Sequence, residues 1–240
     1  RALKGQRVMR IAAEKQQWAR RLIVGAFTAR HGREPSPFEA SSIQAQAAGE
    51  TGYGSWPFRK LDGTPVKNYN NWGAVQSRSP TISDASDKHA DGTPYQQYFM
   101  VYPSHEAGCA DLVRHMSAPM RPLTADAMAR GQLEGPGGVS DAMRRENYYG
   151  GFCQAAVKKY GSAVRKKGTE AWDACHVEAT AGHTKAFRLW FAEFEASGLP
   201  VGEGEGAEGK ADGSGSSPEP EPSEASSISG LQPGDPYSDD

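Results

Sequence analysis

The 240-residue sequence lacks long apolar runs and is poor in cysteine. No stretch approaches the roughly 20 apolar residues that a membrane-spanning helix needs, so we expect no membrane span. The apolar run at residues 22–27 is too short and too late in the chain for a signal peptide. The three cysteines form no Cys-x-x-Cys pair, which argues against a zinc ribbon or a thioredoxin-like motif. One disulfide among Cys109, Cys153 and Cys175 is compatible with this count.

Large apolar side chains are also scarce at the C-terminal end. Residues 200–240 carry a net charge of −9, and Gly, Ser and Pro make up more than half of them. Such a segment cannot offset its conformational entropy by burying apolar surface. We therefore predict a folded domain over residues 1–199 and a disordered acidic tail over residues 200–240. This tail is a candidate tether to a larger virion or secretion assembly.

The predicted folded domain carries the opposite charge, a net +7. This charge suits an anionic polymer such as nucleic acid, a membrane surface or a bacterial cell wall, but ordinary solvated charge explains it equally well. No nucleic-acid-binding motif accompanies it, so we expect no nucleic-acid partner.

Apolar residues recur at helical spacing over most of the predicted domain. The pattern over residues 8–27 predicts a first helix that ends near Gly32. The segment Ser36-Pro37-Phe38-Glu39 combines an N-cap serine, a proline and a glutamate in a capping box that opens a second helix. Further helices are expected to start from caps at Ser104, Thr124, Ser140 and Thr169.

Helical periodicity is lost over residues 55–103, which are rich in Gly, Pro, Asn and Asp. Residues 98–102 form a strand-like run, and the turn signal Asp-Gly-Thr-Pro at residues 91–94 precedes it. We therefore predict a mainly α fold of the α+β type, with a helical body and a small antiparallel β lobe.

Glu50 is notable for its position at the carboxyl end of a helix of small, apolar residues, between Gly49 and Gly52. The carbonyl end of a helix is electronegative, so a partly desolvated carboxyl group there retains its proton to higher pH. A general acid that works near neutral pH requires this property. On position alone, an ordinary exposed glutamate in a C-terminal turn is the favoured interpretation.

The segment after Glu50 is rich in side chains that bind sugars. Aromatic rings stack on pyranose faces, and amides hydrogen-bond to hydroxyl and acetamido groups. The aromatic candidates are Tyr53, Trp56, Tyr69, Trp72 and Tyr95, and the amide candidates are Asn70 and Asn71. Some of these aromatic residues are expected in the core.

Four short motifs occur in order along the chain. They are Gly-Glu-Thr-Gly-Tyr-Gly at residues 49–54, Asn-Asn-Trp-Gly-Ala-Val at 70–75, Tyr-Phe-Met-Val-Tyr-Pro-Ser at 98–104, and Tyr-Tyr-Gly-Gly at 148–151. This series resembles the glucosaminidase-type peptidoglycan hydrolases of the lysozyme-like superfamily, which include flagellar-cap hydrolases, autolysins and phage lysins. The resemblance covers roughly residues 36–165.

The resemblance implies a role for several residues. Glu50 corresponds to the family's general acid, the segment from Asn70 to Trp72 to the floor of the cleft, and the β lobe to a cover over the sugar. A tyrosine after the later helices contributes to the site. Tyr148 or Tyr149 fills that position; we assign Tyr149 to catalysis and Tyr148 to substrate binding.

The chain departs from the family in its second carboxylate. Some members have a glutamate in the β lobe, but residues 74–103 contain none. Asp87 or Asp91 is the expected replacement and would activate water, whereas the substrate's own N-acetyl group is the alternative nucleophile. Both aspartates are equally well explained as turn formers.

We expect no metal or cofactor. Residues 87–92 resemble the start of a calcium loop, but the twelfth position from Asp87 is Tyr98, where such a loop needs a bidentate glutamate. Zinc ligation by His89 with His105 or His115 has no recognised spacing.

The sequence therefore predicts a peptidoglycan hydrolase, foremost an endo-β-N-acetylglucosaminidase, whose partner is the glycan strand. Such a protein acts in the periplasm or outside the cell, after export, phage delivery or injection. Muramidase or lytic transglycosylase activity is the nearest alternative, and a non-catalytic cell-wall-binding module of a virion or secretion apparatus is another. A cysteine peptidase or amidase, with Cys153 as nucleophile and His176 or His183 as base, is the remaining enzyme class.

Overall fold

The computed structural model describes residues 11–77, 83–149 and 153–202, without the side chains of residues 83 and 84. The chain divides into two units, Arg1–Ala207 and Glu208–Asp240, and the second lies wholly outside the described residues. The predicted tail falls outside them as well, apart from residues 200–202.

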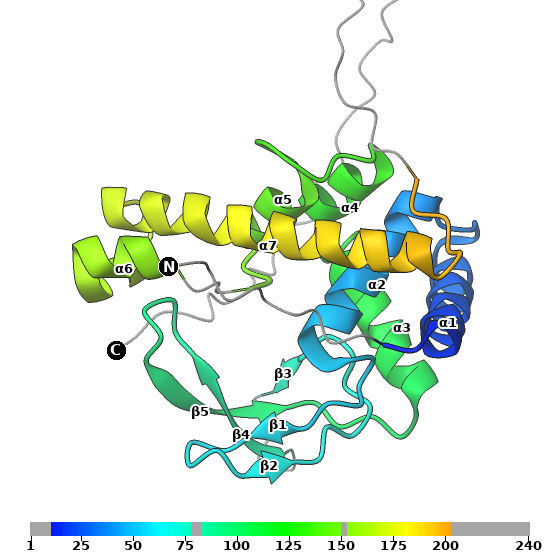
Figure 1. Cartoon of the computed structure of the whole chain (residues 1–240), viewed down its shortest axis with the longest axis horizontal. Coiled ribbons are helices and arrows are strands. Elements are labelled where there is room, and N and C mark those ends of the chain that lie inside the picture. Colours follow the sequence, from blue (N-terminus) through cyan, green and yellow to red (C-terminus); the bar gives the residue numbers. More distant parts are fainter. Residues whose placement is uncertain (1–10, 78–82, 150–152, 203–240) are drawn as a thin grey trace, which may run out of the picture. The chain divides into compact units, whose positions relative to one another are not determined.

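The described residues form a mainly α fold of the α+β type, as the sequence predicts (Figure 1). The helices are α1 (Ala13–His31), α2 (Pro37–Thr51), α3 (His105–Met116), α4 (Pro122–Ala129), α5 (Val139–Arg145), α6 (Gln154–Tyr160) and α7 (Glu170–Ala196), with a short 3-10 helix, η1 (Gly161–Arg165), before α7. None of the described helices is long and apolar enough to cross a bilayer.

Small antiparallel sheets make up the β lobe. Strands β1 (Phe58–Arg59) and β2 (Pro65–Val66) form a two-stranded ladder. The second sheet has the order β3-β5-β4, from β3 (Gln76–Ser77), β4 (Ser83–Lys88) and β5 (Pro94–Phe99). The chain therefore pairs β4 with β5 as a hairpin, in which Asp87 lies opposite Tyr95.

Helix α2 is the central helix of the body. Twelve of its fifteen residues are buried, so it has no wide polar face of the kind that a surface helix shows. Its alanines and serines allow α1, α4 and α7 to pack closely on it, and α7 crosses it on one side (Figure 1). This packing fixes the direction of α2, whose C-terminal end lies where the chain enters the β lobe.

A second, smaller core lies away from α2. It consists of Cys153, Ala156, Val164, Ala171 and Cys175, from α6, η1 and the first turns of α7. Ala90, in the turn of the β4–β5 hairpin, packs against this core. The β lobe therefore contacts the helical body at two places, at the end of α2 and at the hairpin tip.

The folded body extends slightly beyond the predicted boundary at residue 199. Arg20 donates a hydrogen bond of 2.9 Å to the carbonyl of Pro200, and Val201 is buried in the main core. Gly202 lies against the start of α2, where an added Cβ would be 3.0 Å from the Phe38 nitrogen. Residues 200–202 therefore belong to the body and not to the tail.

The capping predictions are partly confirmed. Ser36, Ser104 and Thr169 cap α2, α3 and α7, and each hydroxyl accepts a backbone N–H three residues later. The predictions for Thr124 and Ser140 are wrong, because the N-caps are Arg121 and Gly138, three and two residues earlier. Similarly, β5 covers residues 94–99 and ends inside the predicted strand at 98–102.

Candidate active site

Glu50 lies in the last turn of α2 and is exposed to solvent. The helix ends one residue later, at Thr51, because Gly52 adopts the left-handed conformation, with φ of 55°, and its N–H bonds back to the carbonyls of Ala47 and Ala48. The half-buried indole of Trp56 packs directly over Gly52, where an added Cβ would be 2.4 Å from the ring. Glu50 is therefore an accessible carboxyl group two residues before the glycine that the Trp56 ring covers.

The protein around Glu50 favours its protonated form. Although the side chain is accessible, the surrounding protein desolvates it enough to raise its pKa to about 7. The negative charge of Asp87 raises this pKa further, and a hydrogen bond from Gln46 opposes the rise. The electronegative end of α2 acts in the same direction as desolvation. Near pH 7, about half of such groups carry the proton that a general acid must donate.

Asp87 is the carboxylate of the β lobe that interacts with Glu50. Its Oδ2 accepts a hydrogen bond of 2.9 Å from Gln76 Nε2, and the Tyr95 hydroxyl lies 3.5 Å from the same oxygen. The His89 ring stacks on Tyr95 at a centroid distance of 4.4 Å. Asp87 and Tyr95 are thus held together on adjacent strands that face the end of α2.

Asp91 has a structural position. Its Oδ2 accepts a hydrogen bond of 2.8 Å from Arg165 Nε on η1, and its Oδ1 accepts one of 3.0 Å from the Thr93 amide. Desolvation alone would raise the pKa of Asp91, but the bonds from Thr93 and Arg165 outweigh it and lower the pKa to about 2. The prediction of Asp91 as a water-activating group is therefore corrected, because its oxygens are engaged in joining the hairpin tip to the body.

Of the two neighbouring tyrosines, Tyr148 and not Tyr149 lies beside Glu50. Desolvation raises the pKa of Tyr148, and the charge of Glu50 adds to the rise, so this ring lies beside the acid. Gly73 makes room for it, since an added Cβ would be 2.9 Å from the Tyr148 hydroxyl. Tyr149 instead donates a 2.9 Å hydrogen bond to the Ser140 carbonyl. Its predicted catalytic role is wrong, because its hydroxyl is committed to the backbone of α5.

Three predicted sugar-binding residues belong to the interior. Tyr53 and Trp72 have no exposed surface, and their rings pack together at 5.5 Å. Asn71 is also fully buried, and its amide bonds to the backbone of Val75 and Met100. These residues brace the loop beside α2, and their predicted contact with substrate is wrong because solvent does not reach them.

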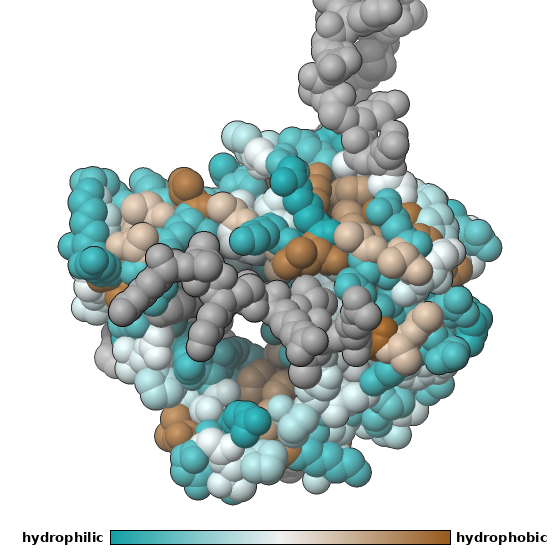
Figure 2. Space-filling model, in the orientation of Figure 1, coloured by the Kyte–Doolittle hydropathy of each residue, from teal (hydrophilic) through white to brown (hydrophobic). Residues whose placement is uncertain are grey.

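Trp56, Asn70 and Tyr95 remain candidates for substrate contact. Each is partly exposed in the region between the end of α2 and the β lobe. Asn70 donates one amide hydrogen to the Tyr102 carbonyl at 3.0 Å. Figure 2 shows an opening between the helical body and the β lobe.

Sequence reasoning missed the residues behind Glu50. Gln46, one turn earlier on α2, donates a hydrogen bond of 3.1 Å to Glu50 Oε1. The Gln46 carbonyl oxygen is 3.1 Å from His183 Nε2, on α7, and His183 Nδ1 is 2.9 Å from the Ser140 hydroxyl. The spacing of four residues between Gln46 and Glu50 was the one signal in the sequence.

The cysteines hold no nucleophile. Cys153 and Cys175 form a disulfide, and Cys109 is buried in the main core. The disulfide confirms the prediction that one pair of cysteines could be bonded. The alternative in which Cys153 is a peptidase nucleophile is wrong, because a disulfide-bonded cysteine has no free thiol. His176, a proposed base for that reaction, is hydrogen-bonded to Asp141 at 2.8 Å.

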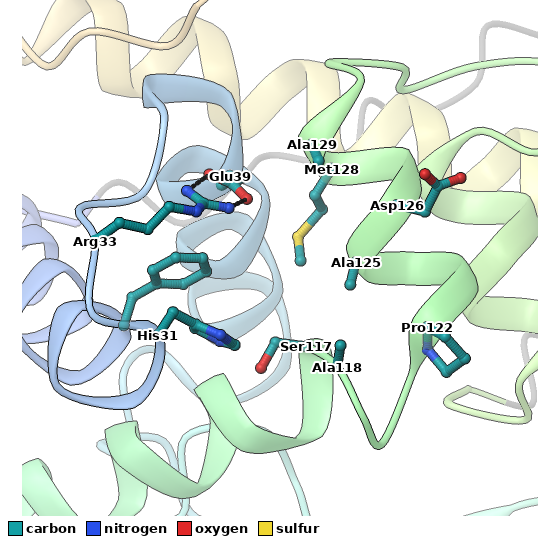
Figure 3. A pocket seen from close by; sticks show the side chains of 11 residues that line it. His31, Arg33, Glu39, Ser117, Ala118, Pro122, Ala125, Asp126, Met128 and Ala129 are labelled. Atoms are coloured by element: carbon teal, nitrogen blue, oxygen red, sulfur yellow. Dashed lines mark hydrogen bonds and ion pairs between the residues drawn. The ribbon is translucent and has the colours of Figure 1, made fainter. Parts of the chain in front are cut away.

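A separate cavity of about 320 Å³ lies at the opposite end of α2 (Figure 3). Its lining includes Phe27, His31, Met128 and the ion pair of Arg33 with Glu39. Glu39 lies eleven residues before Glu50, or about 16 Å along the helix axis. The cavity does not include Glu50, and both oxygens of Glu39 are used by Arg33 and the capping box.

Within the described part of the chain, no three His, Cys, Asp or Glu side chains cluster as metal ligands. No family model, curated protein or solved structure matches the chain. The functional argument therefore depends on the chemistry of Glu50 and its neighbours.

Proposed function

We propose that this protein is a peptidoglycan hydrolase that cleaves β-1,4 glycosidic bonds of the glycan strand, with Glu50 as the general acid. The observation that carries the proposal is an accessible carboxyl group whose pKa is raised to about 7 by desolvation and by Asp87. Glycosidic oxygens are poor leaving groups unless they are protonated, and a carboxylic acid with a raised pKa is the usual donor. The order of motifs from residue 49 to residue 151 supports the same family of reactions.

In the proposed reaction, protonated Glu50 donates its proton to the glycosidic oxygen, and the bond between that oxygen and the anomeric carbon breaks. Positive charge then develops on the sugar ring, and the carboxylate of Asp87 stabilises it. Water completes hydrolysis, activated by Asp87 or after attack by the substrate's own acetamido group. Trp56 and Tyr95 offer rings for sugar stacking, and Tyr148 lies beside the acid.

The favoured substrate bond is the one that an endo-β-N-acetylglucosaminidase cleaves, and the site of action is the periplasm or the cell exterior. A lytic transglycosylase is the second candidate, because such an enzyme needs one acid/base group and the β lobe of this chain contains no glutamate. Product analysis separates the two. A reducing-end N-acetylglucosamine indicates glucosaminidase activity, whereas a 1,6-anhydro-muramyl end indicates transglycosylase activity.

The test is the clearing of purified sacculi by the wild-type protein and by Glu50→Gln. We expect the variant to clear them about 100-fold more slowly or worse, because general acid catalysis contributes 10² to 10⁴. Glu195→Gln is the matched control, since it removes an exposed carboxylate at the far end of α7. If both proteins bind sacculi and neither clears them, the hydrolase proposal is wrong and a wall-binding module is the supported function.

A further inference from the structure

Glu50 is the last member of a chain of polar groups that crosses three helices. The chain runs from Ser140 on α5 through His183 on α7 and Gln46 on α2 to Glu50 Oε1, with distances of 2.9, 3.1 and 3.1 Å. Helix α7 packs against both α2 and α5, which brings the four residues together (Figure 1). No step of the proposed reaction uses Ser140, His183 or Gln46 directly.

The imidazole of His183 is held in one orientation and stays neutral. The Tyr149 ring stacks on it at 4.2 Å and 8°, and the Phe187 ring packs at 4.4 Å. Desolvation lowers the pKa of His183 to about 4. At neutral pH the ring therefore has one N–H donor and one nitrogen acceptor.

The neutral ring restricts the directions of the hydrogen bonds. With Gln46 donating its amide to Glu50, the Gln46 carbonyl must accept from His183, so His183 carries its proton on Nε2. Nδ1 is then the acceptor, and the Ser140 hydroxyl donates to it. The reverse arrangement would place the Gln46 carbonyl against Glu50 and require the acid to donate its proton there.

The orientation of the Gln46 amide determines which oxygen of Glu50 carries the proton. When the Gln46 amide donates to Oε1, the proton of the neutral acid resides on Oε2, and none of the described residues hydrogen-bonds to that oxygen. When the Gln46 carbonyl faces Glu50, the proton is bound to it and directed away from the substrate. The orientation of one amide group therefore decides whether the acid proton is available.

We propose that His183 and Gln46 are positioning residues, which hold the Gln46 amide toward Glu50 and so keep the proton of the general acid on Oε2. The kinetic consequences rest on the proposed function, but the hydrogen-bond directions do not. Among the described residues, the groups that face Glu50 are Gln46 from α2, Asp87 from β4 and Tyr148 from the segment after α5. Of these, Gln46 is the one that His183 contacts directly, and Gln46 also interacts with Tyr148.

The test is an NMR titration of the Glu50 side-chain carboxyl carbon in the full chain, with its signal assigned by its absence in Glu50→Gln. His183→Phe keeps an aromatic ring between Tyr149 and Phe187 but removes both nitrogens. Loss of the directed donor should raise the pKa of Glu50 by about 0.5 to 1. Gln46→Leu should raise the pKa of Glu50 by a similar amount. In His183→Gln, whose amide can donate to Gln46, the pKa of Glu50 should stay at the wild-type value.

His176→Phe is the matched control, because it makes the same substitution two turns earlier on α7 and removes a hydrogen bond to Asp141 that does not reach Glu50. Ser140→Ala is a milder second variant if His183→Phe does not fold. It removes the donor to Nδ1 and should also raise the pKa of Glu50. The ¹⁵N shifts of His183 in the wild-type protein should show the proton on Nε2 at pH 7.

The proposal is overturned if the proton is on Nδ1, if His183→Phe or Ser140→Ala leaves the Glu50 pKa unchanged, or if His176→Phe raises it as much. In sacculus clearing, His183→Phe should lower kcat about 10-fold with little change in KM. A wild-type protein that clears no sacculi refutes the proposed function, and the titration still decides the positioning role.

Discussion

Asp91, at the tip of the β4–β5 hairpin, is ion-paired with Arg165 on η1. The same guanidinium donates a hydrogen bond of 3.1 Å to the Thr93 hydroxyl. Ala90 packs on the small core beside this pair. The hairpin is therefore attached to the helical body at its tip as well as at its base, which fixes the strand that carries Asp87.

We predict that Asp91→Asn and Arg165→Gln each lower the free energy of unfolding by about 0.5 to 1 kcal/mol, since Arg165 is partly exposed. The double variant should lose little more than Arg165→Gln alone, because both substitutions disrupt the same ion pair and Arg165→Gln also removes the bond to Thr93. Hydrogen bonds lower the pKa of Asp91 to about 2, below its unfolded value of about 4. This stabilisation is therefore complete above pH 4 and is lost as the pH falls toward 2. Denaturant unfolding at pH 6 and pH 2.5 measures both effects.

For Asp87 we predict an effect on the pKa of Glu50 and on the rate of reaction. Removal of its charge in Asp87→Asn should lower the pKa of Glu50, because that charge contributes to the raised value. The alkaline limb of the pH–rate profile for sacculus clearing should then move to lower pH, and the maximal rate should fall. Asp91→Asn is the control and should leave the limb where it is in the wild type. A shift of the alkaline limb in Asp91→Asn, and none in Asp87→Asn, would contradict this prediction and indicate that Asp91 takes part in the reaction.

The disulfide between Cys153 and Cys175 closes a sequence separation of 22 residues. Cys153→Ala with Cys175→Ala should lower the free energy of unfolding by about 3 kcal/mol, chiefly by freeing the unfolded chain. Thermal unfolding with and without reductant measures this change. Iodoacetamide should leave sacculus clearing by the oxidised protein unaltered, because Cys109 is buried. Inactivation by iodoacetamide would favour thiol chemistry.

Gly52 and Gly182 should respond in opposite directions to alanine. At Gly52, the left-handed backbone and the Trp56 ring at 2.4 Å leave no room for a Cβ, so we expect a loss of at least about 1 kcal/mol. Gly182 lies within α7, and an added Cβ would meet nothing within 4 Å. Gly182→Ala should therefore stabilise the protein by about 0.5 to 1 kcal/mol. Chemical unfolding of both variants checks the pair, and equal effects would contradict this account.

The local signals in the sequence were reliable where one turn of chain determines the structure. The capping box at Ser36 and Glu39 needs four residues, and it begins α2 where we predicted it. Thr124 and Ser140 failed as caps for an equally local reason, because Pro122 is favoured at the first position of a helix and Gly138 precedes Val139. Such errors displace the start of a helix by two or three residues and leave the architecture unchanged.

The aromatic residues show where local reasoning is insufficient. Tyr53 and Trp56 are three residues apart, yet Tyr53 is fully buried and Trp56 is partly exposed. Composition cannot distinguish them, because burial depends on which distant segments pack against each ring. In the same way, Asp87 and Asp91 lie in one hairpin, but among the described residues only Asp91 bonds to an arginine, which is 74 residues later in the chain.

The sequence by itself determined the mainly α class of the fold, the starts of α2, α3 and α7 and the placement of Glu50 at the end of a helix, because each depends on spacing and capping within a few turns. The tertiary structure decided which aspartate interacts with Glu50, which tyrosine lies beside it and how Gln46 is oriented. The contact between Gln46 and His183 joins residues 137 positions apart. Only the packing of α7 across α2 creates it, and no local pattern encodes that packing.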